Sequence, residues 1–163
     1  MIVRAAAGIL ALAALDCAGE GATFTVKSIT PEAAVKAAKS ALDKCRTEGF
    51  QVTVAVVDRS AVTVALVRDR YASPGSVEIA QRKAQTAINF KMDTAALDRE
   101  LQPGRPTAGI RTQAGVTAIA GGAIIEAGGA LVGAIGVSGA PGPANDDLCA
   151  HAGIKAIAED LEF

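Results

Sequence analysis

Residues 121–153 read GGAIIEAGGALVGAIGVSGAPGPANDDLCAHAG. Two apolar runs, 123–126 and 130–138, flank the pair Gly128-Gly129. Glycines adopt the positive φ angles that a two-residue hairpin turn requires, so the pattern predicts two antiparallel strands. The second run breaks at a Gly/Pro-rich segment, and a terminal helix is expected over about 145–161.

Three glycines recur in the second predicted strand, at Gly133, Gly136 and Gly139. Glycine weakens a strand, so a run of glycines requires a reason. Close approach of a ligand is one reason, and tight packing of a helix on the sheet is the other. The sequence leaves both open.

The remainder of the chain supplies further helices and strands. Thr30-Pro31-Glu32 is typical of a helix start, and Gly49 of a helix end. The expected strands are 51–58, 62–68 and 116–120, the expected further helices are 76–90 and 94–101, and 103–115 is a long irregular loop. Hairpins and helices in separate blocks favour the α+β class, with an antiparallel sheet of about five strands flanked by helices.

Composition and charge narrow the class of protein. The 163 residues fit one domain, and hydrophobic residues make up 50% although aromatic residues make up only 3%. The core is therefore built from Ala, Val, Ile and Leu. The formal net charge is −1 and no segment concentrates lysine or arginine, which argues against binding to nucleic acid.

The N-terminus resembles an export signal. Arg4 precedes an apolar run, 5–15, that is too short to span a bilayer, and 16–22 is small and polar. We therefore expect a signal peptide over 1–22, a single domain over 23–163, and a periplasmic or secreted bacterial protein without a stable membrane span. A buried N-terminal helix of a cytoplasmic protein is the alternative, and Cys17 raises a lipoprotein signal as another.

Two cysteines remain after such cleavage, Cys45 and Cys149, and both fall in predicted helices. In an oxidising compartment they can form a disulfide. Small buried hydrophobic side chains are the other interpretation.

The sequence contains no catalytic signature, which favours a binding protein over an enzyme and leaves both open. His151 is the only histidine, and it follows Asp147 by four residues, so both share a helix face. The carboxylate could orient the imidazole; an interface histidine in a helical ion pair is the alternative. Met92 and Tyr71 are possible haem ligands by chemistry alone.

Four segments carry a resemblance to a known family. They are VTVAVVDRSAVTVALVRD (52–69), the segment 74–90 with Lys83, Thr86 and Phe90, the Gly121-Gly122 pair with GAIGVSG (133–139), and DDLCAHAGI (146–154). Together they are similar to the GlcG/HbpS haem-binding family, which is also found as the C-terminal domain of some corrinoid adenosyltransferases. The resemblance covers about residues 30–160. Ala61 departs from it, because the family usually has a turn glycine at that position.

The resemblance implies a profilin-like layered fold, assembly into homo-oligomers, and haem as cofactor. It places candidate cofactor-binding residues at Lys83, Thr86 and Phe90, and at Gly136 and Ser138 of the glycine-rich strand. No axial ligand transfers from the family. Arg82 and His151 are added for their own chemistry, with His151, the only histidine, as the candidate axial ligand of the haem iron. Lys83, Arg82 and Arg105 are candidates for pairing with the haem propionates.

Three functions remain in competition. The first is an exported haem-binding protein that serves haem storage, sensing or oxidative metabolism. The second is an accessory protein or enzyme that binds a small carboxylate, with Lys83 or Arg111 at the anion and Ser138 or Asp58 near the reacting centre. The third is an oligomer in which the small residues serve packing alone.

Overall fold

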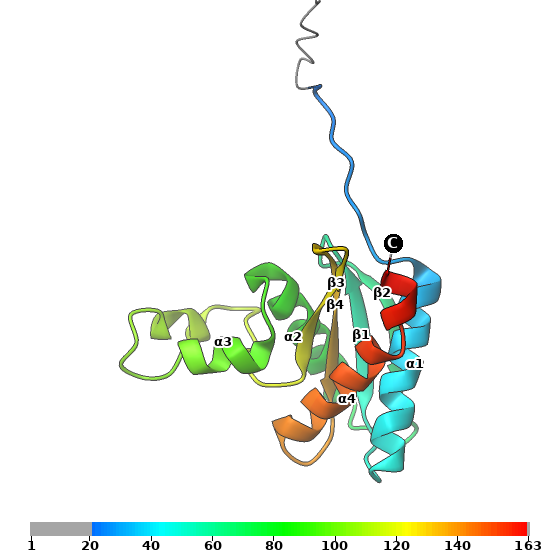
Figure 1. Ribbon diagram of the computed structural model, residues 1–163. Coiled ribbons are helices and arrows are strands. Elements are labelled where there is room, and N and C mark those ends of the chain that lie inside the picture. The colour runs from blue at the N-terminus through cyan, green and yellow to red at the C-terminus, as the bar shows by residue number, and fades with distance from the viewer. Residues whose placement is uncertain (1–20, 163) are drawn as a thin grey trace, which may run out of the picture.

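A four-stranded antiparallel sheet forms the centre of the protein, in a computed structural model that describes residues 21–162 (Figure 1). The signal-peptide prediction falls almost entirely on residues 1–20, outside the described residues. The strands are β1 (Thr53–Asp58), β2 (Thr63–Arg68), β3 (Gly122–Ala127) and β4 (Ala130–Ser138). Their order is β2-β1-β4-β3, with every neighbouring pair antiparallel.

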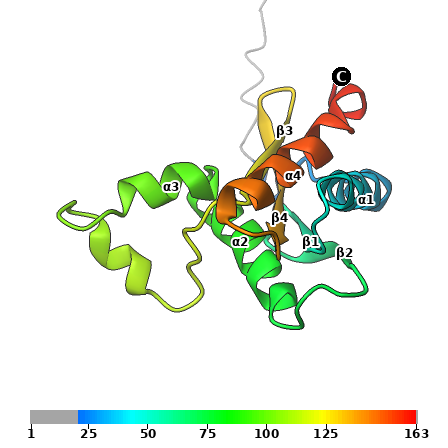
Figure 2. The same cartoon turned by 90° about the horizontal axis from the view of Figure 1, so that it is seen from below.

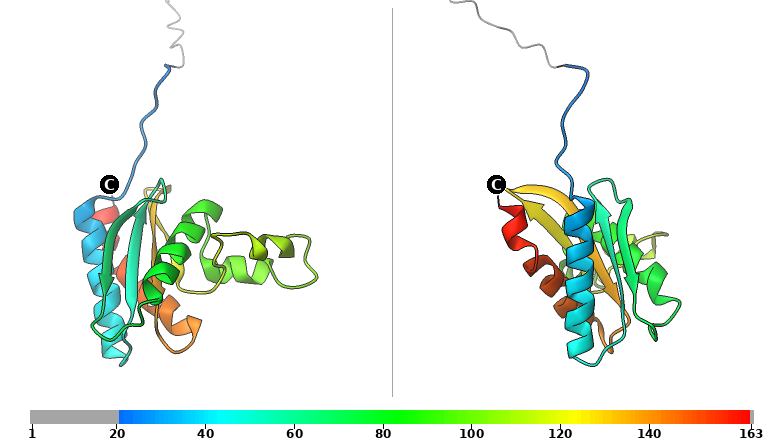
Figure 3. Two further views of the ribbon diagram at one scale, coloured as in Figure 1. Left: turned by 180° about the vertical axis from the view of Figure 1, so that it is seen from behind. Right: turned by 90° about the vertical axis from the view of Figure 1, so that its right-hand side faces the viewer.

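Helices cover both faces of the sheet (Figure 3). The helices are α1 (Pro31–Thr47), α2 (Ser76–Phe90), α3 (Thr94–Glu100) and α4 (Pro143–Lys155), and short 3-10 helices span Ala108–Thr112 and Ala158–Leu161. α1 and α4 contact each other on one face, and α2 packs against β4 and β1 on the other. The α+β prediction with helices flanking an antiparallel sheet is confirmed.

The predicted strand over 116–120 is wrong, which is why the sheet has four strands and not about five. The backbone N–H of Thr117 donates to the Thr86 hydroxyl oxygen at 2.9 Å, and Ala118 is buried against Leu97 and Leu101. Contacts with the helices, not with a neighbouring strand, thus fix this apolar segment. The terminal helix also differs from its prediction, because α4 ends at Lys155 and a separate 3-10 turn follows.

The glycines of the hairpin have two different roles. Gly128 and Gly129 have φ angles of 55° and 75°, as the predicted tight turn requires. A Cβ atom on Gly136 would collide with the backbone of α2, at the carbonyl oxygen of Ala80 and 2.6 Å from the nitrogen of Ala84. Helix packing therefore explains Gly136, and it holds α2 directly against β4.

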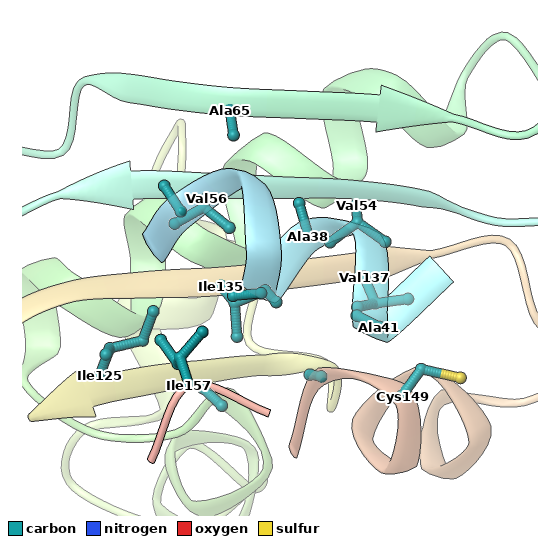
Figure 4. Close-up of a cluster of buried hydrophobic side chains, with 14 of the residues drawn as sticks. Ala38, Ala41, Val54, Val56, Ala65, Ile125, Ile135, Val137, Cys149 and Ile157 are labelled. Carbon is teal, nitrogen blue, oxygen red and sulfur yellow. The ribbon is translucent and has the colours of Figure 1, made fainter. Parts of the chain in front are cut away.

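The larger core lies between the sheet and the pair α1 and α4 (Figure 4). Branched side chains of the sheet face small residues of the helices, among them Val54, Val56, Ile135, Val137, Ala38 and Ala41. A disulfide between Cys45 and Cys149 joins α1 to α4 across this core. The two cysteines thus form the bond that the sequence left undecided.

Ala61, where the resembling family usually has glycine, lies in the turn after β1. Ala61 has a φ angle of 65°, a left-handed conformation that glycine adopts without strain. One carboxylate oxygen of Asp58 accepts hydrogen bonds from the backbone nitrogens of Ser60 and Val62, at 2.8 and 2.9 Å. Asp58 therefore closes this turn.

A projecting segment, residues 91–120, extends beyond α2 away from the sheet (Figures 1 and 2). It has a small core of its own, in which Leu97, Leu101 and Ala118 are buried. The Thr94 hydroxyl bonds both backbone groups of Gly122, accepting from the nitrogen at 2.8 Å and donating to the oxygen at 3.2 Å. These bonds attach the base of the projecting segment to the edge strand β3.

Candidate functional site

Lys83 and Asp146 form a buried ion pair. Lys83 lies on α2 and is only 2% exposed. Its ammonium donates to the Asp146 carboxylate at 2.8 Å and to the carbonyl oxygen of Val137 at 2.9 Å. The other oxygen of Asp146 accepts from the backbone nitrogen of Ala140 at 3.0 Å. The pair thus connects α2, β4 and the first turn of α4.

Two opposing effects act on the Asp146 carboxyl. Burial raises its pKa, and the hydrogen bond and charge of Lys83 act in the opposite direction. Burial is the larger effect, so the pKa of Asp146 stands above its ordinary value. A buried carboxylate of this kind depends on its partner, because an unpaired charge in this position would be strongly destabilising.

A pocket of about 390 Å³ opens beside the ion pair. It lies between the starts of α2 and α4, and its lining includes Ser138, Ile79 and Ile119 together with Lys83 and Asp146. The structure therefore brings two of the candidate residues, Lys83 and Ser138, into one site. Asp146 belongs to the same site, and sequence reasoning missed it.

His151 lies elsewhere on α4 and is half-exposed, at 51% for its side chain. Its Nε2 atom is 3.5 Å from a carboxylate oxygen of Asp147 and 3.5 Å from one of Asp93. Both acids are held by the backbone, since Asp147 accepts from the nitrogen of Gly121 and Asp93 from that of Ile124. The predicted proximity of Asp147 is confirmed, and Asp93 is an additional neighbour from the projecting segment.

The remaining candidate residues lie neither in the pocket beside the ion pair nor next to His151. Arg82 is exposed and pairs with Glu78 one turn earlier. Thr86 is buried, where its hydroxyl oxygen accepts from Thr117. Phe90 is half-buried against the core of the projecting segment, and Gly136 contacts α2 as described above.

The charged residues of the alternative hypotheses are also engaged locally. Arg105 pairs with Glu100, and Arg111 pairs with Asp98, both within the projecting segment. Tyr71 is 80% exposed. None of these side chains lines the pocket beside the ion pair.

A second pocket, of about 660 Å³, lies between residues 26–30 and the start of α1. Apolar side chains such as Ile29, Val132 and Leu161 line it, and Lys36 at its edge pairs with Asp160. It contains none of the candidate residues. Among the described residues, its lining has no histidine, cysteine, methionine or tyrosine that could bind iron.

Residues 21–162 lack two features, a cluster of metal-binding side chains and a membrane-spanning helix. No group of three or more His, Cys, Asp or Glu side chains in this part of the chain could hold a metal ion. No helix of the same part is long and apolar enough to cross a membrane.

Comparison with solved structures shows extensive similarity. A double mutant of Streptomyces reticuli HbpS is 34% identical, with a TM-score of 0.79 over 94% of this chain and 99% of that chain. Klebsiella pneumoniae ORFY is 26% identical, with a TM-score of 0.81 over 85% and 96%. A complex of PduOC with haem is 27% identical, with a TM-score of 0.76 over 80% and 95%.

A comparison with curated proteins finds no match. A family model described as "Haem degrading protein HbpS-like" matches residues 29–155, most of the chain. The match includes α1 to α4, the whole sheet and both groups of candidate residues. The chain belongs to the HbpS-like family.

Proposed function

We propose that this protein is an exported haem-binding protein and that His151 is the ligand of the haem iron. One observation carries the proposal: the only imidazole of the sequence is accessible on a fold shared with a relative that is known as a haem complex. Histidine is a common axial ligand of haem iron. When bound, haem would supply the iron and its absorption spectrum.

The surroundings of His151 fit such a ligand. Asp93 and Asp147 contact Nε2, which leaves Nδ1 as the ring nitrogen available to iron. Carboxylates beside a metal-binding histidine fix the orientation of its ring. Leu148, three residues earlier on the same face of α4, is an exposed apolar side chain that can contact a porphyrin.

The propionates require a cation, and Lys83 no longer suits that role. Its ammonium is buried with Asp146, so a propionate would have to displace the carboxylate. Lys155 is exposed one turn after His151 on the same helix face. We therefore assign Lys155 to the propionates. A single accessible ligand favours exchangeable capture of haem, as in storage or sensing.

Titration with haemin, followed at the Soret band, tests the proposal. The wild-type protein is expected to shift the band with one haem per chain, and His151→Ala is expected to weaken binding by at least about tenfold. Tyr71→Phe and Met92→Leu remove the other two candidate ligands and should bind as the wild type does. Absence of a shift in the wild type would refute the proposal of haem binding. Retention of the shift in His151→Ala would refute the assignment of His151 as the ligand of the iron.

Export of the protein rests on the N-terminal pattern and is supported by the disulfide, since such bonds persist in oxidising compartments. We expect a mature protein that begins near Thr23 in the periplasmic or secreted fraction. Mass spectrometry of the intact chain measures this, and an unprocessed Met1 terminus in that fraction would contradict it. Assembly into a homo-oligomer stays a prediction, which the mass in solution tests.

A further inference from the structure

The pocket between the starts of α2 and α4 has features that the haem proposal does not use. Both helices begin at the same end of the molecule (Figure 3, left). Their N-cap residues, Gly75 and Gly142, both line this pocket of about 390 Å³, and neither helix start has a side-chain cap. Helix N-termini carry partial positive charge and attract anions. Two of them therefore converge on one cavity.

Ser138 provides independent support for a ligand. It is only 6% exposed, and its hydroxyl has no hydrogen-bond partner within residues 21–162. Successive side chains of a strand point to opposite faces of the sheet. Ala134 and Gly136 of β4 face α2, so the side chain of Ser138 points to the same face. There it lines the pocket. The hydroxyl is not fully enclosed by protein but opens into the pocket, where a ligand that accepts its hydrogen bond can take the place of solvent.

Two neighbouring buried hydroxyl groups, those of Thr53 and Ser76, already have partners. The hydroxyl oxygens of Thr53 and Ser76 are 2.7 Å apart, and the Ser76 hydroxyl also donates to the carbonyl oxygen of Ser73 at 2.6 Å. Of these three buried hydroxyl groups, that of Ser138 is therefore the one without a partner in the described residues. Its hydroxyl can donate to an acceptor that enters the pocket.

The charges beside the pocket limit the charge of the ligand. The Lys83 ammonium has three donors, of which Asp146 and Val137 accept two, so one remains. The Asp146 carboxylate neutralises most of the lysine charge. The remaining attraction comes from one ammonium N–H, the helix N-termini and Ser138. This arrangement suits one negative charge and disfavours two.

The rim of the pocket is apolar. Ile79 and Ile119 are 42% and 47% exposed and lie on opposite segments, α2 and the end of the projecting segment. We propose that this pocket binds a small aliphatic monocarboxylate, with its carboxylate at Ser138 and its alkyl chain between Ile79 and Ile119. The proposal is independent of haem binding.

Butanoate is the probe that tests this site, in the haem-free protein. Calorimetry is expected to show binding of butanoate, and binding of butanamide at least about tenfold weaker, because a hydrogen bond to a charged group is stronger than one to a neutral group. Backbone amide shifts in NMR spectra should change at residues 138–140, at Gly142 and at residues 75–79. Equal binding of the amide, or shift changes confined to other residues, would overturn the proposal.

Ser138→Ala tests the role of the hydroxyl, and Ser60→Ala is the matched control in an exposed turn. We expect Ser138→Ala to weaken butanoate binding about tenfold or more, from the loss of a hydrogen bond to a charged group. Ser60→Ala should leave binding unchanged. Unchanged binding in Ser138→Ala would show that the hydroxyl does not bind the carboxylate, and it would contradict the proposed placement of the ligand. Because haemin is titrated separately, failure of either proposal leaves the other standing.

Discussion

Replacement of Lys83 by methionine is expected to lower the free energy of unfolding at neutral pH by about 3–5 kcal/mol, since removal of one partner leaves a buried, uncompensated charge. Methionine keeps much of the length of the lysine side chain, so the change acts mainly on the charge. Asp146 would keep only the backbone nitrogen of Ala140 as a donor. Urea unfolding of the wild type and the variant measures the difference.

A second substitution separates charge from packing. In the Lys83→Met background, Asp146→Asn removes the stranded charge and keeps an oxygen that can accept from Ala140. We expect the double variant to recover much of the lost stability, because both charges of the pair are then absent. A double variant no more stable than Lys83→Met would show that packing, not charge, causes the loss.

Arg82→Met is the matched control on the same helix. Arg82 and Glu78 form an exposed pair at spacing i,i+4, and such pairs contribute about 0.3–0.5 kcal/mol. The expected loss is therefore several times smaller than for Lys83→Met. Similar losses in both variants would contradict the interpretation that burial makes Lys83 important.

The pH dependence of the Lys83 variant follows from the direction of the Asp146 shift. A carboxyl whose pKa is raised on folding contributes stability that is fully present below its unfolded pKa and is lost as pH rises through its folded pKa. Without Lys83 the pKa of Asp146 rises further. The stability difference between variant and wild type should therefore shrink as pH falls and the carboxyl becomes protonated.

A second carboxyl does not disturb this comparison. Arg46 lowers the pKa of Asp69 through a hydrogen bond of 2.7 Å, so the stability that Asp69 contributes is lost as pH falls. This effect has the opposite sign to that of Asp146. It is the same in the wild type and in Lys83→Met, and it cancels in their difference.

Local patterns in the sequence predicted the elements well. The glycine pair at 128–129 predicted the hairpin, and the apolar period of 76–90 predicted α2 with its observed bounds. These predictions succeed because turn conformations and helix periodicity depend on neighbouring residues. The run at 116–120 failed because an apolar segment can pack against helices as well as against a strand.

The site itself was less accessible to sequence reasoning. Lys83 and Asp146 are 63 residues apart in the chain. No local sequence pattern distinguishes either residue from an exposed charged residue. Asp93, which lies between α2 and α3, is close to His151 and also accepts a hydrogen bond from the backbone of Ile124 in β3. Such contacts arise from tertiary packing. The resemblance could indicate that Lys83 matters, but not that its partner is a carboxylate.

Removal of the disulfide is the second change with a large expected effect. Cys45 and Cys149 are 104 residues apart, and cross-linking a loop of this length removes about 4–5 kcal/mol of chain entropy from the unfolded state in the simplest treatment. Native disulfides of small secreted domains typically contribute about 2–5 kcal/mol. We expect a loss in that range for Cys45→Ala/Cys149→Ala, measured by urea unfolding of the oxidised proteins.

The reductant control determines whether the bond or the side chains cause that loss. Both cysteines are fully buried in the core between α1 and α4, where alanine differs from a thiol only by the sulfur atom. If the bond is responsible, the wild type in a phosphine reductant should fall to nearly the stability of the double variant, and the variant should not respond. A wild type unaffected by complete reduction would contradict the expected effect. If reduction does destabilise the domain, the protein is most stable in an oxidising compartment, as the proposed export requires.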